Sequence, residues 1–395
     1  MFFMRKIVEK TAMILLPVMM LTSIQSPVFA SDDMQPVIEE NTVDLKLECK
    51  SAMLMEANTG EILYEQNADE ALPPASVTKV MTLLLVMEAI DEGKISLDDT
   101  VTTSAHAASM GGSQIFLKEG ETMSVEDMLK SVVIASANDA ACALAEFVSG
   151  SETAFVKRMN ERAAELGMKN TSFENTNGLD DTAEKHLTSA RDIAIMSREL
   201  IKHKKILEYS SIWMDTVRNG LFGLTNTNRL VRFYRGCTGL KTGSTSKAGF
   251  CVSATAVRDG VSLICVIMGA ESGDKRNAIA AGLLDWGFAN YGVYTYTPEA
   301  LDPIKLTGGT SPLVRIEAQS FQCVIEKGKM STVKYSFELP ESLSAPIKKG
   351  DGVGRIVFTC DGKEIGSSDV CAAEDVPRIS FFVLWYRMLA KFLLK

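Results

Sequence analysis

Hydrophobic positions between residue 49 and about residue 295 form two kinds of pattern: short apolar runs, and longer segments with helical spacing. Two pairs of apolar runs, each pair interrupted by a turn that contains glycine, predict β-hairpins. The longer segments predict helices. The hairpins are expected at 51–68, turning at Asn58-Thr59-Gly60, and at 249–270, turning at Asp259-Gly260; the helices are expected at 76–91, at 123–150 with a break in the middle, at 151–167 and at 275–291. This mixture predicts an α/β (α+β) domain over 49–298.

Residues typical of helix ends support these boundaries. Ser124 precedes an apolar periodic segment and has Asp127 three residues later, which is the pattern of an N-cap. Gly167 follows the helix predicted at 151–167 and is a candidate C-cap. The two prolines Pro73 and Pro74 come just before the apolar run at 76–91, where a helix readily begins.

The pattern changes after Pro303. Residues 304–372 consist of short β-type runs, such as VRIEAQ, VKYSFELP and RIVFTC, separated by Gly, Pro and Asp turns. Runs of this length without helical segments between them predict a separate, smaller all-β domain over 303–374.

The last segment, RISFFVLWYRMLAKFLLK, has a third pattern. Arg387, Lys391 and Lys395 are four residues apart and would lie on one face of a helix, with aromatic and aliphatic residues elsewhere. We expect an amphipathic helix over 377–395 that lies in a membrane interface, with its cationic face toward the lipid headgroups. A short membrane span and a helix docked on the β domain are the alternatives.

The N-terminal residues are predicted to be a secretory signal peptide. Arg5, Lys6 and Lys10 come first, an apolar stretch of about ten residues follows, and the segment ends in VFA, with small residues at the two positions that a signal peptidase reads. Cleavage is expected after Ala30. The protein is therefore expected to be exported and to work at the cell envelope.

A retained N-terminal anchor is the alternative to the signal peptide. Pro17 interrupts the apolar stretch, and its length falls short of the roughly 20 residues that span a membrane, so the alternative is the weaker one. Residues 31–48 are predicted to contain a polar, acidic linker and the first strand.

Composition and charge limit the function classes. The chain has 395 residues, 46% hydrophobic and 23% charged, which is enough for a sizeable core and two domains. Its net charge is -9, and it has no basic stripe outside its two ends, so a nucleic-acid partner is not expected.

The distribution of the eight cysteines does not predict a disulfide framework. Cys142, Cys251 and Cys265 lie in apolar runs and are expected to be small buried hydrophobic residues. No CxxC pair occurs, which argues against a zinc site. A pairing such as Cys360 with Cys371 stays open.

Neither a metal nor a cofactor is expected from the remaining ligand-type residues. His106, His186 and His203 are scattered along the chain and lack carboxylates at metal-ligand spacing. Each is therefore expected to be a surface or structural residue.

One lysine stands inside a long apolar run. Lys79 is the only charged residue between Glu70 and Glu88, in PPASVTKVMTLLLVMEAI, and Ser76 lies three residues before it. On a helix the two side chains share a face. Ser76 would lie in the first turn, where free backbone N–H groups favour negative charge, and burial would lower the pKa of Lys79 enough for it to accept a proton from Ser76.

A serine three residues before a lysine occurs often by chance, but two further polar clusters make the pattern specific. SAN, residues 136–138, falls at the break between two apolar helices, where polar side chains have no packing role. LKTGST, residues 240–245, contributes a cation, a hydroxyl and a glycine just before the strand that begins near Gly249. S-x-x-K, S-x-N and K-T-G in this order, about 60 and 105 residues apart, are the motifs of the serine enzymes that react with penicillin.

The chain resembles the D-alanyl-D-alanine carboxypeptidases among the low-molecular-mass penicillin-binding proteins. The resemblance rests on the three motifs and on further segments, namely GSQIFLKEGETMSVEDMLKSVVIASANDAA, LGMKNTSFENTNGL, TNTNRLV, GCTGLKTGSTSKAGF and KKGDGVG. It covers most of the chain after the signal peptide. It implies a penicillin-binding/β-lactamase-like catalytic domain, a smaller all-β domain and a C-terminal amphipathic anchor at the outer face of the cytoplasmic membrane.

The same resemblance implies a role for each residue of the motifs. Ser76 would be the acylated nucleophile and Lys79 its general base; Ser136 would relay protons, and Asn138 would orient the substrate and Lys79. Lys241 and Thr242 would bind the terminal carboxylate of the substrate, beside Gly243, and the backbone N–H groups of Ser76 and Ser244 would form the oxyanion hole. Some relatives have His where this chain has Ser244, a change that a backbone donor tolerates.

The implied reaction is removal of the terminal D-alanine from a peptidoglycan pentapeptide that ends in D-Ala-D-Ala. Lys241 would attract the C-terminal carboxylate, which makes the enzyme an exopeptidase, and its charge would further favour a neutral Lys79. β-Lactam antibiotics would be covalent inhibitors.

Three other readings share parts of this pattern. A class A β-lactamase needs a glutamate that activates the deacylating water, but Glu165 in AAELGMKN is expected to be a helix-surface residue. A transpeptidase would transfer the acyl group to an amine acceptor in place of water. A non-catalytic penicillin-binding sensor or scaffold at the envelope would not need the serine and lysine together.

Overall fold

The computed structural model describes residues 45–180 and 183–393. The predicted signal peptide and most of the predicted linker therefore lie outside the described residues. The expected strand within 31–48 is not found in the described part of that range, because residues 45–48 form no regular element and the first strand begins at Ser51.

A five-stranded antiparallel sheet with the order β2-β1-β9-β8-β7 forms the centre of the larger domain. Its strands are β1 (Ser51–Glu56), β2 (Ile62–Gln66), β7 (Cys237–Thr245), β8 (Gly249–Arg258) and β9 (Val261–Ala270). Both predicted hairpins are confirmed, as β1 pairs with β2 and β8 with β9. Asp259 and Gly260 have φ of 49° and 80°, as the two central residues of a type I′ turn require.

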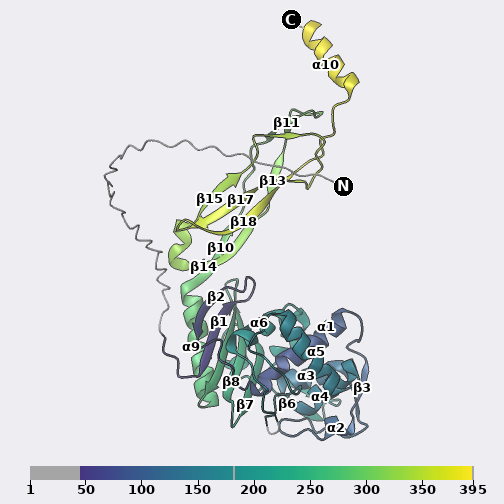
Figure 1. The fold of residues 1–395 in the computed structure, drawn as a ribbon, viewed down its shortest axis with the longest axis vertical. Coiled ribbons are helices and arrows are strands. Elements are labelled where there is room, and N and C mark those ends of the chain that lie inside the picture. The colour runs from purple at the N-terminus through teal and green to yellow at the C-terminus, as the bar shows by residue number, and fades with distance from the viewer. Residues whose placement is uncertain (1–44, 181–182, 394–395) are drawn as a thin grey trace, which may run out of the picture. The chain divides into compact units, whose positions relative to one another are not determined.

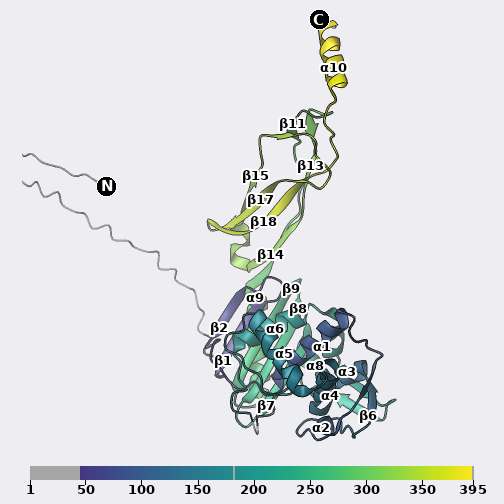
Figure 2. The same ribbon diagram turned by 45° about the vertical axis from the view of Figure 1, so that its right-hand side comes forward.

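Helices cover both faces of this sheet, which explains why its central strands are apolar throughout. Met53 and Met55 of β1 belong to one hydrophobic core, while Ala52 and Leu54 belong to the other. Helix α9 (Gly273–Asn290) packs on the second face, and α6 (Ala190–Leu200) lies on the first, as Figures 1 and 2 show. Strands buried on both sides read as continuous hydrophobic runs.

The helices on the α6 face include the predicted helix-break-helix segment and the apolar helix that contains Lys79. They are α1 (Lys79–Asp91), α2 (Ala105–Ala108), α3 (Val125–Ile134), α4 (Asn138–Ser149), α5 (Glu152–Glu165) and α7 (Lys204–Ser210), with two small hairpins, β3 (Thr100–Thr102) with β4 (Thr122–Ser124) and β5 (Met214–Val217) with β6 (Phe222–Thr225). The short helix α8 (Leu230–Phe233) instead contributes Leu230 to the core on the α9 face. The predicted N-cap is confirmed, because Ser124 Oγ accepts the Asp127 N–H at 3.1 Å.

The helix predicted at 76–91 needs a correction at its start. Residues Ala75–Thr78 form the 3-10 turn η1, and the α-helix begins at Lys79. Ser76 therefore lies in a tighter turn ahead of α1, and Lys79 is the first residue of the α-helix.

The smaller all-β domain is confirmed and surrounds one aromatic cluster. Its strands are β10 (Tyr291–Tyr296), β11 (Ile304–Thr307), β12 (Leu313–Val314), β13 (Ile316–Ala318), β14 (Phe321–Glu326), β15 (Lys334–Glu338), β16 (Ser342–Ser344), β17 (Gly352–Cys360) and β18 (Lys363–Ala372), with the 3-10 turn η2 (Lys327–Thr332). Phe358 is fully buried and stacks on Phe321 with ring centroids 4.1 Å apart. Strand β10 follows α9 directly and pairs with β14 of the smaller domain. Residues 291–296, which were predicted to belong to the larger domain, therefore form a strand of the smaller one.

The C-terminal helix α10 (Phe381–Leu393) has exposed apolar side chains. Phe381, Phe382 and Trp385 are among them. Of the predicted basic face, the structure describes the side chain of Arg387, and Lys395 lies outside the described residues. None of the helices in 45–180 and 183–393 combines the length and the apolar character that crossing a membrane takes.

All eight cysteines are free thiols in the structure. Cys142, Cys251 and Cys265 are fully buried, as predicted from their apolar surroundings. Cys360 and Cys371, whose pairing the sequence left open, are not bonded to each other.

Two glycines in α9 provide a matched test of how this helix packs on the sheet. A Cβ added to Gly287 would lie 2.7 Å from Leu54 Cδ2 and 2.8 Å from Leu263 Cδ1, whereas one added to Gly282 would meet no atom within 4 Å. We expect Gly282→Ala to raise the free energy of unfolding by up to about 1 kcal/mol, because alanine is the better helix former. Gly287→Ala should instead lower the free energy of unfolding by about 1–3 kcal/mol, because the added methyl group would overpack the core between α9 and the sheet.

Urea unfolding of both variants at 25 °C measures the difference. Equal stability of the two variants would contradict the close approach of α9 to β1 and β9.

Candidate active site

Ser76 lies at a point where three segments of backbone meet. It is half-buried in η1, and the residue before it, Ala75, has a φ of 48°. A Cβ on Gly178 would lie 1.9 Å from the Ala75 carbonyl oxygen, and one on Gly243 would lie 2.8 Å from Ser76 N. Only glycine permits both approaches, so the turn that carries the hydroxyl is held by backbone on two sides.

Lys79 is fully buried beneath this turn and contacts three oxygen atoms. Its Nζ lies 2.9 Å from Ser76 Oγ, 2.5 Å from Asn138 Oδ1 and 2.8 Å from the Asn177 carbonyl oxygen. Burial is the main cause that lowers the pKa of Lys79 well below its usual value. The nearby charge of Lys241 lowers the pKa further, while Asp139 opposes the shift.

The kinds of atom around Lys79 Nζ define how a neutral amine would be oriented. The amide oxygen of Asn138 and the carbonyl oxygen of Asn177 can only accept hydrogen bonds. A neutral amine has two N–H groups and donates both to these atoms, so its lone pair faces the third neighbour, Ser76 Oγ. This is the arrangement that removes a proton from a serine hydroxyl.

Asn138 is fixed in the orientation that this geometry needs. It is buried at the first position of α4, and its Nδ2 donates to the Gly111 carbonyl oxygen at 2.7 Å. The amide oxygen is therefore the atom that faces Lys79. The next residue, Asp139, has a buried carboxylate that accepts backbone N–H groups of Ile115 and Leu117, which anchors the segment beside the site.

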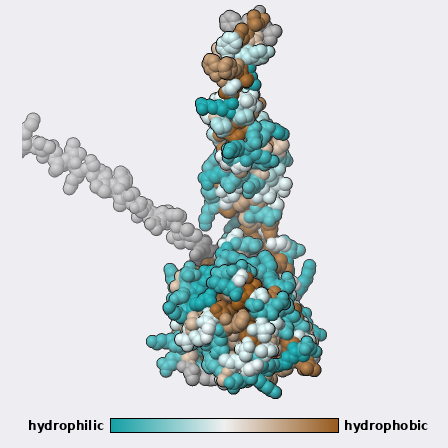
Figure 3. Space-filling view, turned by 90° about the vertical axis from the view of Figure 1, so that its right-hand side faces the viewer, coloured by the Kyte–Doolittle hydropathy of each residue, from teal (hydrophilic) through white to brown (hydrophobic). Residues whose placement is uncertain are grey.

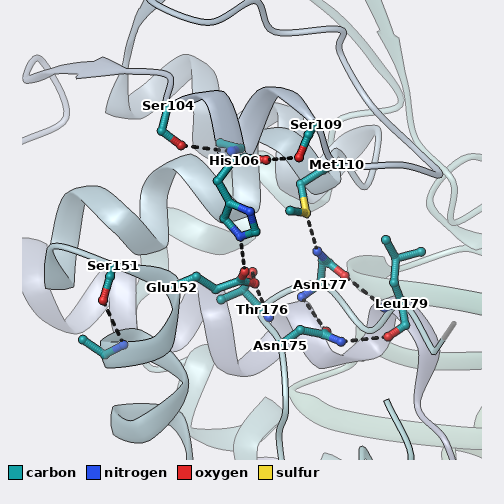
Figure 4. A network of polar contacts seen from close by, with 12 residues as sticks. Ser104, His106, Ser109, Met110, Ser151, Glu152, Asn175, Thr176, Asn177 and Leu179 are labelled. Carbon is teal, nitrogen blue, oxygen red and sulfur yellow. Dashed lines mark hydrogen bonds and ion pairs between the residues drawn. The ribbon is translucent and has the colours of Figure 1, made fainter. Parts of the chain in front are cut away.

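The carbonyl of Asn177 is presented by a compact turn held by amide side chains, shown in Figure 4. Asn175 Oδ1 accepts the Gly178 N–H at 2.7 Å, and Asn175 Nδ2 donates to the Leu179 carbonyl oxygen at 2.7 Å. Asn177 Oδ1 accepts the Leu179 N–H at 2.9 Å. These bonds fix the direction of the main chain at the residue that accepts from Lys79.

Ser136 belongs to the short break between α3 and α4, two residues before Asn138. It is 4% exposed and has a φ of 62°, a strained conformation for a residue with a side chain. The second motif thus contributes Asn138 to the surroundings of Lys79, and its first residue, Ser136, for which the resemblance implied a proton relay, has a strained backbone.

Strand β7 places the third motif at the edge of the sheet. Lys241 is 1% exposed and donates to the Thr242 carbonyl oxygen at 2.9 Å, and Thr242 Oγ1 donates to Thr227 Oγ1 at 2.7 Å. Burial lowers the pKa of Lys241 to about 7, and the neighbouring Arg276 guanidinium adds to the shift.

One side of β7 carries no strand, because β7 is an end member of the sheet and pairs only with β8 among the described strands. Ser244 is exposed on it, opposite Phe250 of β8. An edge strand can pair with an extended peptide through its free backbone groups. Gly243 lets this strand pack directly against the Ser76 turn, a reason for glycine that the sequence did not reveal.

A buried histidine supports the Ser76 turn from behind. His186 Nδ1 accepts the Glu174 N–H at 3.0 Å, so its proton is on Nε2, which lies 2.7 Å from Thr78 Oγ1. Thr78 Oγ1 in turn donates to the Ala75 carbonyl oxygen at 2.8 Å. Burial lowers the pKa of His186 to about 4. The prediction of a structural role is therefore right for this histidine.

Sequence reasoning missed several members of this group. Asn177, Asp139 and Thr227 were given no role, although Asn177 lies in LGMKNTSFENTNGL, Asp139 directly follows SAN and Thr227 lies in TNTNRLV. Glu165 is exposed at the end of α5 and forms an ion pair with Arg162 at 3.0 Å, as expected of a surface residue.

Metal-ligand atoms also come together outside this group. His106, Cys142 and Glu152 lie close enough to one another for their ligand atoms to hold one ion. The sequence predicted no metal-binding constellation, and the fold assembles one from residues far apart along the chain.

Comparison with known proteins follows the same division of the chain. Residues 37–272 match the family model described as D-alanyl-D-alanine carboxypeptidase, and residues 314–378 match that of the penicillin-binding protein 5 C-terminal domain. The D-alanyl-D-alanine carboxypeptidase DacF of Bacillus subtilis is 42% identical over 383 residues, which are 95% of this chain and 96% of that protein.

Solved structures of penicillin-binding proteins have the same fold. Penicillin-binding protein 5 from Haemophilus influenzae superimposes with a TM-score of 0.71 at 34% identity, covering 84% of this chain and 98% of that one. Penicillin-binding protein D2 from Listeria monocytogenes, in its ampicillin-bound form, superimposes with a TM-score of 0.57 at 34% identity, covering 62% of this chain and 98% of that one.

The tautomer of His186 predicts a pH dependence of stability. The folded state keeps this ring neutral down to about pH 4, whereas the unfolded chain protonates it near pH 6.5. The folded state binds fewer protons in this window, so the stabilising contribution is complete above pH 6.5 and is lost as the pH falls toward 4, by up to about 3 kcal/mol.

His186→Gln should remove this component of the pH dependence, while His203→Gln should leave it in place. Denaturant unfolding between pH 7 and pH 4 measures it. An unchanged slope in His186→Gln would contradict the assignment of a neutral buried ring.

Proposed function

This chain belongs to the D-alanyl-D-alanine carboxypeptidase family and is a serine-type D-alanyl-D-alanine carboxypeptidase, and on that premise we propose that Ser76 is its nucleophile and Lys79 its general base. The proposal rests on one observation. Lys79 Nζ is buried 2.9 Å from Ser76 Oγ, and its other two neighbours can only accept hydrogen bonds. The substrate would be a peptidoglycan stem pentapeptide that ends in D-Ala-D-Ala.

Acylation would begin with transfer of the Ser76 proton to the lone pair of Lys79. Ser76 Oγ then attacks the carbonyl carbon of the penultimate D-alanine. Negative charge develops on the carbonyl oxygen, and the backbone N–H groups of Ser76 and Ser244 would stabilise it. The absence of a side chain on Gly243 keeps the space beside Ser76 N open.

Collapse of the tetrahedral intermediate breaks the peptide bond and leaves an ester on Ser76. The departing D-alanine nitrogen takes the proton that Lys79 carries, with Ser136 as the relay. Water then attacks the ester and gives up a proton to the regenerated neutral Lys79. When the ester bond breaks, Lys79 passes this proton to Ser76 Oγ, which releases the shortened peptide and restores the free enzyme.

Lys241 and Thr242 would select substrates with a free C-terminal carboxylate. The amine of Lys241 is buried, and its pKa of about 7 means that a bound carboxylate would hold it protonated. Its positive charge then favours the neutral form of Lys79 while the substrate is bound. A binding-only sensor would not need this pair of tuned amines.

β-Lactams would acylate Ser76 in the same way as the substrate. The ampicillin-bound form of the Listeria relative supports this reading, and the surface position of Glu165 leaves a class A β-lactamase without its deacylating base. A transpeptidase would differ in the acceptor alone, so it is distinguished by product analysis with an added amine.

We also propose that the protein works at the outer face of the cytoplasmic membrane, exported by residues 1–30 and attached by α10. The exposed aromatic and aliphatic side chains of α10, brown at the upper end of Figure 3, support an interfacial helix. The β domain would then act as a spacer between the bilayer and the active site.

Lys79→Arg should lower the rate of acylation by fluorescent penicillin about a hundredfold to ten-thousandfold, because a guanidinium does not act as a base near neutral pH. Ser76→Ala should abolish labelling, and mass spectrometry of the wild type should place the adduct on Ser76. Lys202→Arg, the same change at an exposed position, should have no effect.

Release of D-alanine from a D-Ala-D-Ala peptide should follow the same order among these variants. Labelling of folded Lys79→Arg at the wild-type rate would refute the role of Lys79.

Deleting residues 378–395 should release the protein from membranes without changing its activity on soluble peptides, since no residue of the proposed site lies in that segment. Sedimentation with lipid vesicles, together with the rate of D-alanine release, measures both effects. A shortened protein that still sediments with vesicles would count against α10 as the anchor.

A further inference from the structure

Three helices, α2, α4 and α5, bring together a histidine, a cysteine and a glutamate. His106 Nε2 lies 2.7 Å from Glu152 Oε2, and an imidazole nitrogen, Cys142 Sγ and a carboxylate oxygen all lie within 4.8 Å of one another. Cys142 is fully buried, and the His106 side chain is 53% exposed. We propose that these residues bind a divalent transition-metal ion of the zinc class.

The donor set suits a tetrahedral ion. Thiolate, imidazole and carboxylate are the ligands of zinc, at about 2.3 Å for sulfur and 2.0 Å for nitrogen and oxygen. Those bond lengths require a sulfur–nitrogen separation of about 3.5 Å. Because His106 is half-exposed on a short helix, its ring can adjust to reach this separation, and the fourth ligand would be a water on its solvent side.

The carboxylate is already oriented for a ligand, as Figure 4 shows. Glu152 Oε1 accepts two hydrogen bonds from Thr176, from the backbone N–H at 3.1 Å and from Oγ1 at 2.7 Å. Its Oε2 is left to face His106. Metal-binding carboxylates and histidines are held by outer hydrogen bonds of this kind.

A metal ion would replace a proton at this site. Burial raises the pKa of the Cys142 thiol, and the neighbouring Glu152 carboxylate raises it further. On binding, the S–H bond breaks, a metal–sulfur bond forms, and the proton passes to bulk water. His106 would bind through Nε2, the nitrogen that faces Glu152.

The proposed metal site shares two segments with the surroundings of Lys79. Helix α4, which contains Cys142, begins with Asn138, and Thr176 directly precedes the residue whose carbonyl accepts from Lys79. A bound ion would therefore join α2, α4 and α5 to the turn beneath Lys79. Its expected effect is on stability, because the ion does not replace any contact of Lys79.

Cobalt(II) is the probe for this site, since zinc itself has no visible spectrum. Titration of the purified, chelator-treated full chain with Co²⁺ should produce a sulfur-to-cobalt charge-transfer band and the visible bands of a tetrahedral ion, saturating at one equivalent. One equivalent of Zn²⁺ should remove them. A wild-type protein without the charge-transfer band would overturn the proposal.

Variants at two ligands keep the test independent of folding. Cys142→Ala should lose the charge-transfer band, and His106→Gln, a change at a half-exposed position, should weaken Co²⁺ binding at least about tenfold. Cys371→Ala and His203→Gln are the matched controls and should both bind like the wild type. His203 pairs with Asp91 at 2.6 Å without a neighbouring thiol. A band that survives Cys142→Ala would also overturn the proposal.

Thermal unfolding supplies a second measurement. Saturating Zn²⁺ should raise the melting temperature of the wild type by at least about 2 °C and leave that of Cys142→Ala unchanged. Neither measurement depends on the chemistry of Ser76, so penicillin labelling of the metal-free protein separates a failure of this site from a failure of the proposed mechanism.

Discussion

The structure depends on keeping the amine of Lys79 away from water. A buried ammonium is costly unless it is paired with an anion, and Lys79 contacts a hydroxyl, an amide oxygen and a backbone carbonyl, all of them neutral. The neutral amine is therefore the favoured protonation state of Lys79. The apolar residues of α1, the fixed amide of Asn138 and the turn that carries Asn177 all serve this state, because each removes solvent from Nζ or supplies an acceptor.

A second buried amine completes the electrostatics. Lys241 lies near Lys79 and Arg276, and like charges disfavour the charged form of each neighbouring amine. In the proposed mechanism, the C-terminal carboxylate of the substrate would supply an anion beside Lys241. Substrate selection and activation of the proposed base would then be one effect, since a carboxylate paired with Lys241 would keep Lys241 charged and thereby favour the neutral form of Lys79.

The sequence predicted the parts of this site that local geometry determines. Ser76 and Lys79 are three residues apart, so a single helical turn places them on one face, and both sheet hairpins follow from alternating apolar runs and Gly turns. The Asn177 carbonyl was not predictable, because any residue offers a backbone oxygen. Gly178 and Gly243 owe their identity to backbone approaching from elsewhere, which spacing along the chain does not encode.

The histidine, cysteine and glutamate of the proposed metal site show the opposite case. They lie 36 and 10 residues apart along the chain and share no motif. They meet because α2, α4 and α5 pack around one core, whose members include Ala107, Cys142 and Phe155. Substitutions at these ligands would leave Ser76, Lys79 and Asn138 in place, so the two sites can vary independently. Helix α4 is common to both proposed sites: its first residue, Asn138, contacts Lys79, and its fifth, Cys142, would supply the thiolate.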